Sequence, residues 1–93
     1  MTGREADFDM ESISNRSLAK FGLRKAKSYY IGLHGRFAEI AKGLVHFSDY
    51  SFVHLGLKRK NYGSHAIYYK IDSNTILILR VLYQSMDTVL YIK

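Results

Sequence analysis

Mostly apolar residues recur at steps of three and four along the first half of the chain, which is the spacing of one face of an α-helix. The two stripes are Met10, Ile13, Ser17 and Phe21, followed by Ala26, Tyr30, Leu33, Phe37, Ile40 and Leu44. Gly22, between them, is a residue type suited to ending a helix, so the stripes predict a hairpin of two helices. Because Gly32 and Gly35 weaken the second helix in isolation, it needs packing against another element.

After Val45 the pattern changes to that of β-strands. Residues 46–52 are polar and aromatic, which is typical of a loop, whereas Lys58–Tyr62 predict a polar strand. The dipeptide at positions 63–64, Gly-Ser, ends that strand at a turn. We therefore expect the second half of the chain to form a sheet.

Two further strands complete the predicted sheet. His65–Ile71 alternates between two faces. Its apolar face consists of Ile67, Tyr69 and Ile71. After a short turn at residues 72–74, Thr75–Leu82 is apolar on both faces except for Arg80, which predicts a central strand covered on both sides. Val89–Ile92 predict either a short last strand or a tail.

Together these elements predict an α+β fold, in which an N-terminal αα-hairpin packs on a small antiparallel sheet. The length of 93 residues suits one domain, and we expect residues 1–93 to form it. A hydrophobic content of 47% with 24% charged residues argues against disorder. The chain has no Cys, which excludes disulfides, zinc–thiolate sites and cysteine nucleophiles.

Charge is distributed unevenly about the net value of +6. Residues 1–15 contain Arg4 and four acidic residues, a net charge of −3, and residues 16–93 contain the other thirteen basic and four acidic residues, a net charge of +9. The acidic run Glu5–Glu11 suits the first turns of a helix, where carboxylates face the positive end of the helix dipole. The basic remainder predicts an acidic partner, which could be a nucleic acid, an anionic membrane or an acidic protein.

Nothing in the sequence indicates a membrane segment, a metal or a cofactor. Apolar runs such as Ile76–Leu79 are too short to cross a bilayer, and the N-terminus lacks the regions of a signal peptide, so we expect a cytoplasmic protein. The four histidines, His34, His46, His54 and His65, lack the spacing of metal ligands. Glycine-rich phosphate loops are also absent.

The most unusual single residue is Arg80, a cation within the most apolar strand. Burying a cation is costly unless it is paired or faces solvent. Arg80 could therefore be structural, tied to Asp72, Asp87 or backbone carbonyls, or it could bind an anion on an exposed sheet face. If it faces solvent, we expect Arg80→Ala to keep the fold and reduce function.

Two other features could carry binding or chemistry. Lys58, Arg59 and Lys60, interleaved with aromatic residues, could form a surface that pairs with phosphates and stacks on bases, or a solvated edge strand. The aromatic residues are Tyr62, Tyr68 and Tyr69. His65 could carry a proton near neutral pH, or its ring could bond the preceding turn.

Taken together, several short motifs resemble the ParE toxins of type II toxin–antitoxin modules, within the wider RelE/ParE superfamily. The motifs are Gly56-Leu57-Lys58, Tyr62-Gly63-Ser64-His65-x-Ile67-x-Tyr69 and Ile76-x-Ile78-x-Arg80-Val81-Leu82-Tyr83-x-x-Met86-Asp87, with a weaker match at Ser17-x-x-x-Phe21-Gly22-x-x-x-Ala26. Tyr83 stands where the family usually has His. The β-strand that opens the family's fold is missing or vestigial, because only three residues precede the helical segment.

The resemblance implies a non-catalytic toxin that binds and blocks DNA gyrase and causes growth arrest. It also implies neutralisation by a ParD-like antitoxin in a toxin–antitoxin hetero-oligomer, with promoter DNA bound only through the antitoxin. The residues we expect to carry binding are Lys58, Arg59, Lys60, His65, Tyr69, Arg80, Tyr83, Met86 and Asp87.

Two alternatives stay open on the sequence. A RelE-type messenger-RNA endonuclease would use clustered basic and aromatic groups to activate the ribose 2′-OH and protonate the leaving oxygen. Its catalytic residues would be His65, Arg80 and Tyr83, with Tyr91 and Lys93 as further candidates. The other alternative is a toxin remnant that is inert because the first strand is absent.

Overall fold

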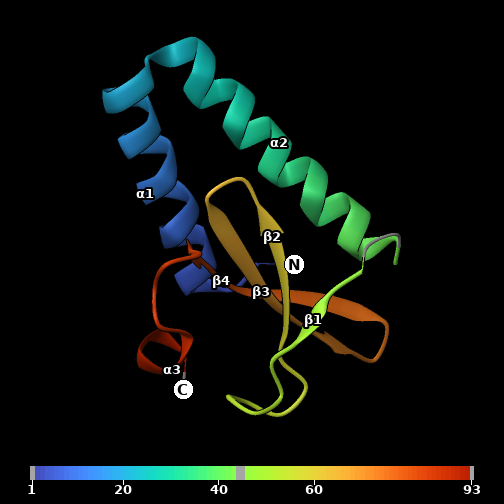
Figure 1. The fold of residues 1–93 in the computed structure, drawn as a ribbon. Helices are drawn as coiled ribbons and strands as arrows, with labels where there is room; N and C mark the ends of the chain where they lie inside the picture. The colour runs from blue at the N-terminus through green and yellow to red at the C-terminus, as the bar shows by residue number, and fades with distance from the viewer. Residues whose placement is uncertain (1, 44–45, 93) are drawn as a thin grey trace.

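Two helices lead into a four-stranded antiparallel sheet in the computed structural model, which describes residues 2–43 and 46–92 (Figure 1). In chain order the elements are α1 (Arg4–Phe21), α2 (Leu23–Ala41), β1 (Ser48–Asp49), β2 (Lys58–Tyr62), β3 (His65–Asp72), β4 (Thr75–Tyr83) and α3 (Thr88–Tyr91). The strands lie in the order β1-β2-β3-β4. This arrangement confirms the predicted α+β fold.

The helical hairpin turns at Gly22, as the sequence predicts. Gly22 has a φ of 84°, and its N–H donates to the carbonyl of Leu18 at 3.1 Å. Members of the two stripes that are buried are Met10, Ile13, Ala26, Leu33 and Ile40. Phe21 is 53% exposed because the tip of the hairpin projects beyond the sheet (Figure 1), and Leu44 lies outside the described residues. Within the described part of the chain, no helix is long and apolar enough to cross a membrane.

Tight turns join the last three strands. β2 and β3 are joined by the predicted Gly-Ser turn, and Tyr62 pairs with His65 on its two sides. β3 and β4 are joined at Ser73 and Asn74, whose φ values of 46° and 68° are those of a hairpin turn with two left-handed residues. Residues 46–52 were predicted to be a loop, but within them Ser48–Asp49 forms the short strand β1, which pairs with β2. Two residues are too few for a periodic signal, so only the pairing partner reveals this strand.

β4 was expected to be a central strand, and this expectation is wrong. β4 is the last strand of the sheet, and polar groups from the N-terminal segment cover its outer edge. Thr2 forms a single parallel bridge with Ile78, and the N–H of Gly3 donates to the Ile78 carbonyl at 2.9 Å. Both faces of β4 are nevertheless packed, which explains its continuous apolar sequence.

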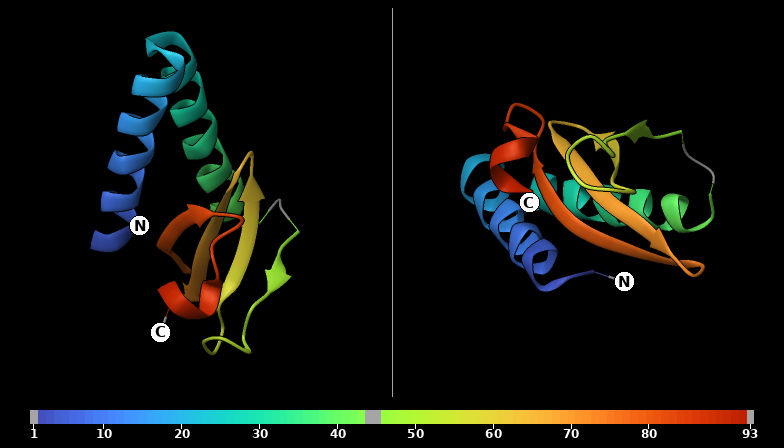
Figure 2. Two further views of the ribbon diagram at one scale, coloured as in Figure 1. Left: turned by 60° about the vertical axis from the view of Figure 1, so that its left-hand side comes forward. Right: turned by 90° about the horizontal axis from the view of Figure 1, so that it is seen from below.

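Helices α1 and α2 lie against one side of the sheet in the ribbon views (Figure 2), and the sheet separates two hydrophobic clusters. The face beneath α1 and α2 buries Ala6, Met10, Ile13, Leu33, Ile40, Ile67, Tyr69, Ile78 and Val81. The opposite face, covered by the segment before β2 and by the C-terminal segment, buries Leu57, Ala66, Tyr68, Leu82 and Ile92. Ile67 and Tyr69 therefore share the predicted face, whereas Ile71 is 54% exposed near the β3–β4 turn.

The C-terminal segment forms neither the predicted last strand nor a tail. Thr88–Tyr91 is a single helical turn, α3. Asp87 caps it, because its Oδ1 accepts a hydrogen bond from the Val89 N–H at 3.1 Å. Ile92 follows and is buried against the second face of the sheet. Thr88, Val89 and Ile92 are β-branched and by themselves favour an extended backbone. The Asp87 cap stabilises a helical turn in their place.

Candidate functional site

An open groove of about 170 Å³ lies where α1, the end of β4 and the C-terminal segment meet. It is lined by Phe8, Asp9, Ser12, Arg16, His65, Arg80, Val81, Leu82, Tyr83, Met86 and Tyr91. It brings together four residues of the predicted site, namely His65, Arg80, Tyr83 and Met86. A larger hollow of about 400 Å³ is lined mostly by α1 and α2 residues, and none of the predicted site residues lines it.

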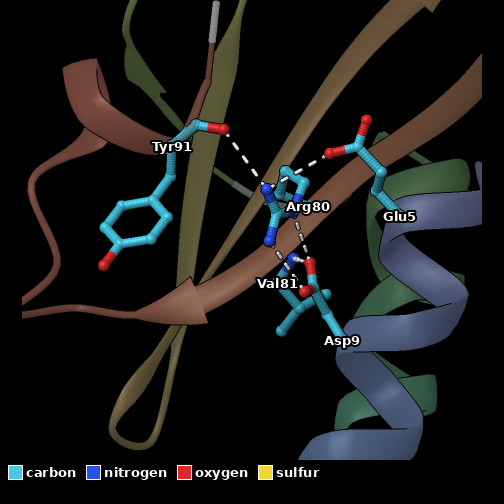
Figure 3. Close-up of polar contacts among 5 residues, drawn as sticks. All are labelled: Glu5, Asp9, Arg80, Val81 and Tyr91. Atoms are coloured by element: carbon cyan, nitrogen blue, oxygen red, sulfur yellow. Dashed lines mark hydrogen bonds and ion pairs between the residues drawn. The ribbon is translucent and has the colours of Figure 1, made fainter.

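Arg80 is tied into the structure by four hydrogen bonds (Figure 3). Its Nε and Nη2 donate to the two carboxylate oxygens of Asp9 at 2.7 and 2.9 Å, a bidentate pair. Its Nη1 donates to Glu5 and to the backbone carbonyl of Tyr91, each at 3.2 Å. The hydrogen bond to Asp9 raises the pKa of Arg80 above its ordinary value, and 19% of the side chain is exposed. Arg80 is therefore a structural cation.

The acidic partners of Arg80 differ from those expected. Asp72 lies at the exposed β3–β4 turn and Asp87 caps α3, so neither pairs with Arg80. The predicted alternative of a bond to a backbone carbonyl is present, because Arg80 donates to the carbonyl of Tyr91. Asp9 has a second role, since its Oδ2 also accepts the N–H of Val81 at 2.9 Å and so completes the open edge of β4. Glu5 and Asp9 are four residues apart and therefore lie on the same face of a helix. This spacing is the sequence signal that could have identified them as the partners of Arg80.

His65 is buried at the start of β3, with 4% of its surface exposed. Its Nδ1 lies 2.6 Å from the Tyr29 hydroxyl, and its ring lies 4.5 Å from that of Tyr83, with 30° between the ring planes. Burial lowers the pKa of His65, and the positive charge of Arg16 lowers it further. The imidazole is therefore neutral at pH 7, which disfavours its use as a protonated acid. Its ring also reaches the preceding turn, because Nδ1 lies 3.5 Å from the Ser64 hydroxyl oxygen. The Tyr29 hydroxyl, for its part, donates to the Tyr62 carbonyl at 3.1 Å.

We expect acid to destabilise the fold through His65. A folded-state pKa below the unfolded value of about 6.5 means that the unfolded chain binds the proton first as pH falls. The contribution to stability is complete above about pH 6.5 and decreases as pH drops toward the folded pKa. Urea unfolding across this range should show the decrease, and His65→Gln should remove part of it. An equal change from His46→Gln, at an exposed position, would contradict the assignment.

The basic strand β2 lies apart from this groove. Lys58 lies 4.9 Å from the Phe47 ring centroid, and Arg59 donates to the Tyr50 hydroxyl at 2.8 Å. Tyr68 and Tyr69, expected to stack on bases, are 0% and 2% exposed. Burial also raises the pKa of Tyr69. Lys58, Arg59 and Lys60 are all partly exposed, so this strand has a charged surface, but two of the three tyrosines that could have stacked on bases are buried.

Sequence reasoning missed the contribution of α1 to the groove. Phe8, Ser12 and Arg16 are spaced by four and so follow one another along the same side of the helix. The guanidinium carbon of Arg16 lies 5.6 Å from the Tyr83 ring centroid. Asp87 does not line the groove, and Lys93 lies outside the described residues. In residues 2–43 and 46–92 no three histidine or acidic side chains are grouped as metal ligands.

Comparison with known proteins identifies the family. The model of the family described as "ParE toxin of type II toxin-antitoxin system, parDE" matches residues 3–88. The chain belongs to the ParE toxin family. A solved structure described as "Chromosomal ParDE TA system from P. aeruginosa" is similar to it, with a TM-score of 0.71 and 15% identity over 88% of this chain and 90% of that one. Among curated proteins the sequence matches none.

Membership of the ParE family makes this chain a toxin of a type II toxin–antitoxin system, so an antitoxin partner is expected. The resemblance drawn from the Gly-Ser-His turn and the Met-Asp ending is confirmed. At 15% identity, the structural match supports the fold: two helices on an antiparallel sheet. In this ParE toxin the groove beside β4 gathers Arg80, Tyr83 and Met86, three of the motif residues that reach the surface.

Proposed function

We propose that this ParE toxin inhibits DNA gyrase by binding it and is neutralised by a ParD-like antitoxin. The observation that carries the proposal is the family match across residues 3–88. The net charge of +9 on residues 16–93 suits an acidic antitoxin segment, which would fold as it binds. On this proposal the two proteins form a hetero-oligomer in the cytoplasm, and the toxin meets promoter DNA only through the antitoxin.

The state of the groove supports binding over catalysis. A nuclease of the RelE type needs a cation free to stabilise the transition-state phosphate and a group able to protonate the leaving oxygen. Four donors of Arg80 already bond to Asp9, Glu5 and the Tyr91 carbonyl. The lowered pKa of His65 leaves its imidazole unprotonated at pH 7. We therefore infer that neither Arg80 nor His65, two of the three candidate catalytic residues, acts in catalysis in this groove.

The finished edge of β4 supports an active toxin over an inert remnant. An unpaired strand edge is open to aggregation. Here Thr2 and Gly3 pair with Ile78, and the Asp9 carboxylate accepts the Val81 N–H, so part of the outer edge of β4 is hydrogen-bonded. The sheet is therefore complete enough to present a stable surface to gyrase or to an antitoxin.

The proposal predicts that the purified chain inhibits gyrase supercoiling in proportion to its concentration. An added ParD-like antitoxin should restore supercoiling. Full supercoiling at large molar excess, while cells that express the chain lose viability, would contradict the gyrase target. Primer extension on messages from those cells separates the nuclease alternative, because new ribosome-dependent cleavage sites would support an enzyme and their absence would argue against one.

A further inference from the structure

One nitrogen of His65 has no hydrogen-bond partner in the described structure. Nδ1 contacts the Tyr29 hydroxyl, but Nε2 is buried and bonds to nothing among the described residues. A buried polar atom without a partner is costly, and such an atom in a folded protein calls for an explanation. Tyr29, which belongs to α2 and contacts Nδ1, does not line the groove, whereas His65 does. We therefore assign Nε2 as the ring nitrogen on the groove side.

Next to this nitrogen the groove carries a cation without an acidic partner. Arg16 is exposed and lies over Tyr83, which in turn stacks on His65. No acidic side chain of the described residues lies within ion-pair distance of Arg16. The other cation of the groove, Arg80, is neutralised by Asp9 and Glu5. The groove therefore has one uncompensated positive charge, close enough to His65 to lower the pKa of the imidazole.

Tyr29 allows Nε2 to become a hydrogen-bond donor. The Tyr29 hydroxyl lies 2.6 Å from Nδ1 of His65 and 3.1 Å from the Tyr62 carbonyl, so its single hydrogen can go to either. When the hydroxyl donates to Nδ1, the neutral imidazole carries its own hydrogen on Nε2. A ligand that accepts at Nε2 selects this tautomer, in which the Tyr29 hydrogen no longer goes to the Tyr62 carbonyl.

We propose that the groove binds a carboxylate, the side chain of an aspartate or glutamate from a protein partner. One oxygen pairs with the guanidinium of Arg16, and the other accepts the Nε2–H of His65. The methylene stem lies against Phe8 and Met86 at the rim of the groove. Because the Tyr83 ring contacts both Arg16 and His65, the carboxylate reaches the two groups together only when this partly exposed ring turns out of its position. That the partner is an antitoxin rests on the proposed function, whereas the carboxylate site itself does not.

A carboxylate fits the groove better than a phosphate. A phosphate carries more negative charge, and the groove offers a single free cation beside the Asp9 carboxylate, which lines it. A planar carboxylate carries one charge and presents two oxygens, matching one guanidinium and one ring N–H. The groove therefore favours an acidic side chain over a nucleic-acid backbone.

The site can be tested on the isolated chain with sodium acetate as the probe. The ring nitrogens of His65 are followed by NMR during titration with acetate, and separately with inorganic phosphate and with chloride, at constant ionic strength. We expect a saturable shift of Nε2 with acetate. Arg16→Gln should weaken acetate binding about tenfold, because it removes the charge-assisted pair. Lys20→Gln, one turn further along α1, removes the same charge outside the groove and should leave binding unchanged.

Three outcomes would overturn the proposal: a linear response to acetate, equal binding in Arg16→Gln and the unaltered chain, or tighter binding of phosphate than of acetate. The last would point to a nucleic-acid ligand. Thermal unfolding of both variants establishes that they are folded, since both positions are exposed on α1. The gyrase assay uses no acetate and the acetate titration uses no gyrase, so failure of one leaves the other standing.

Discussion

Asp9→Asn is expected to destabilise this ParE toxin by about 3 kcal/mol, because it removes one member of a largely buried ion pair. The asparagine keeps the size of the side chain but replaces one of two acceptor oxygens with a donor. Oδ2 of Asp9 serves both Arg80 and the Val81 N–H, and Oδ1 serves Arg80 again. The substitution therefore leaves donors of Arg80, or the Val81 N–H, without an acceptor. Urea unfolding gives the change in free energy.

Glu5→Gln is the matched control for this prediction. Glu5 is one turn before Asp9 on α1 and contacts the same guanidinium, but its side chain is 74% exposed. We expect its loss to cost less than about 0.5 kcal/mol. Similar effects for the two substitutions would contradict the role assigned to burial.

Arg80→Ala should behave as a structural substitution as well. The expectation from sequence was that it would keep the fold, on the condition that Arg80 faces solvent, and the structure does not meet that condition. We therefore expect a large loss of stability, and the double variant Asp9→Ala/Arg80→Ala should lose less than the sum of the single changes. Additive losses would show that the two side chains do not interact.

Gly32→Ala is expected to destabilise the protein by about 2 kcal/mol, although alanine favours helices. A methyl group built on Gly32 would lie 1.7 Å from the Tyr62 hydroxyl oxygen and 2.6 Å from the ring carbon that bears it. Tyr62 packs against the core beneath the helices, so its ring must leave that position or α2 must move away. Either movement costs packing, and thermal unfolding reports the loss.

Gly35→Ala, on the same helix, provides the opposite expectation. Apart from its chain neighbours and the backbone of its own helix, no atom of the described residues lies within 4 Å of a methyl group at Gly35. Alanine there should stabilise the protein by about 0.5–1 kcal/mol through helix propensity alone. In a Tyr62→Ala background the Gly32→Ala substitution should also become stabilising, because the clashing ring is gone. A destabilising effect that persists in that background would show that Tyr62 is not the cause.

The sequence predicted most of the fold because helices and strands each bury one face at a regular spacing. Both helices, the turn at Gly22 and the hairpin at residues 72–74 follow from that regularity and from local turn residues. The failures have local causes as well. A two-residue strand has no period, and the Asp87 cap outweighs the extended preference of the last residues.

The candidate site was only partly predictable. Motif residues from two strands pointed to His65, Arg80 and Tyr83, and the groove brings them together. The helix that forms the other wall was missed, since Arg16 and Ser12 belong to no motif. Tyr69, expected on the binding surface, is part of the core because it alternates with Tyr68 across two packed faces.

The sequence by itself determined the helical hairpin, the sheet and the resemblance to ParE toxins, since these depend on residue spacing along a continuous segment. Only the tertiary structure decided that Arg80 is a partly buried structural cation and that β4 is an edge strand covered by α1. Asp9 lies 71 positions before Arg80 in the sequence. Several carboxylates could have paired with that cation, and only the docking of α1 along β4 selects the one whose oxygens meet both the guanidinium and the free edge of the strand.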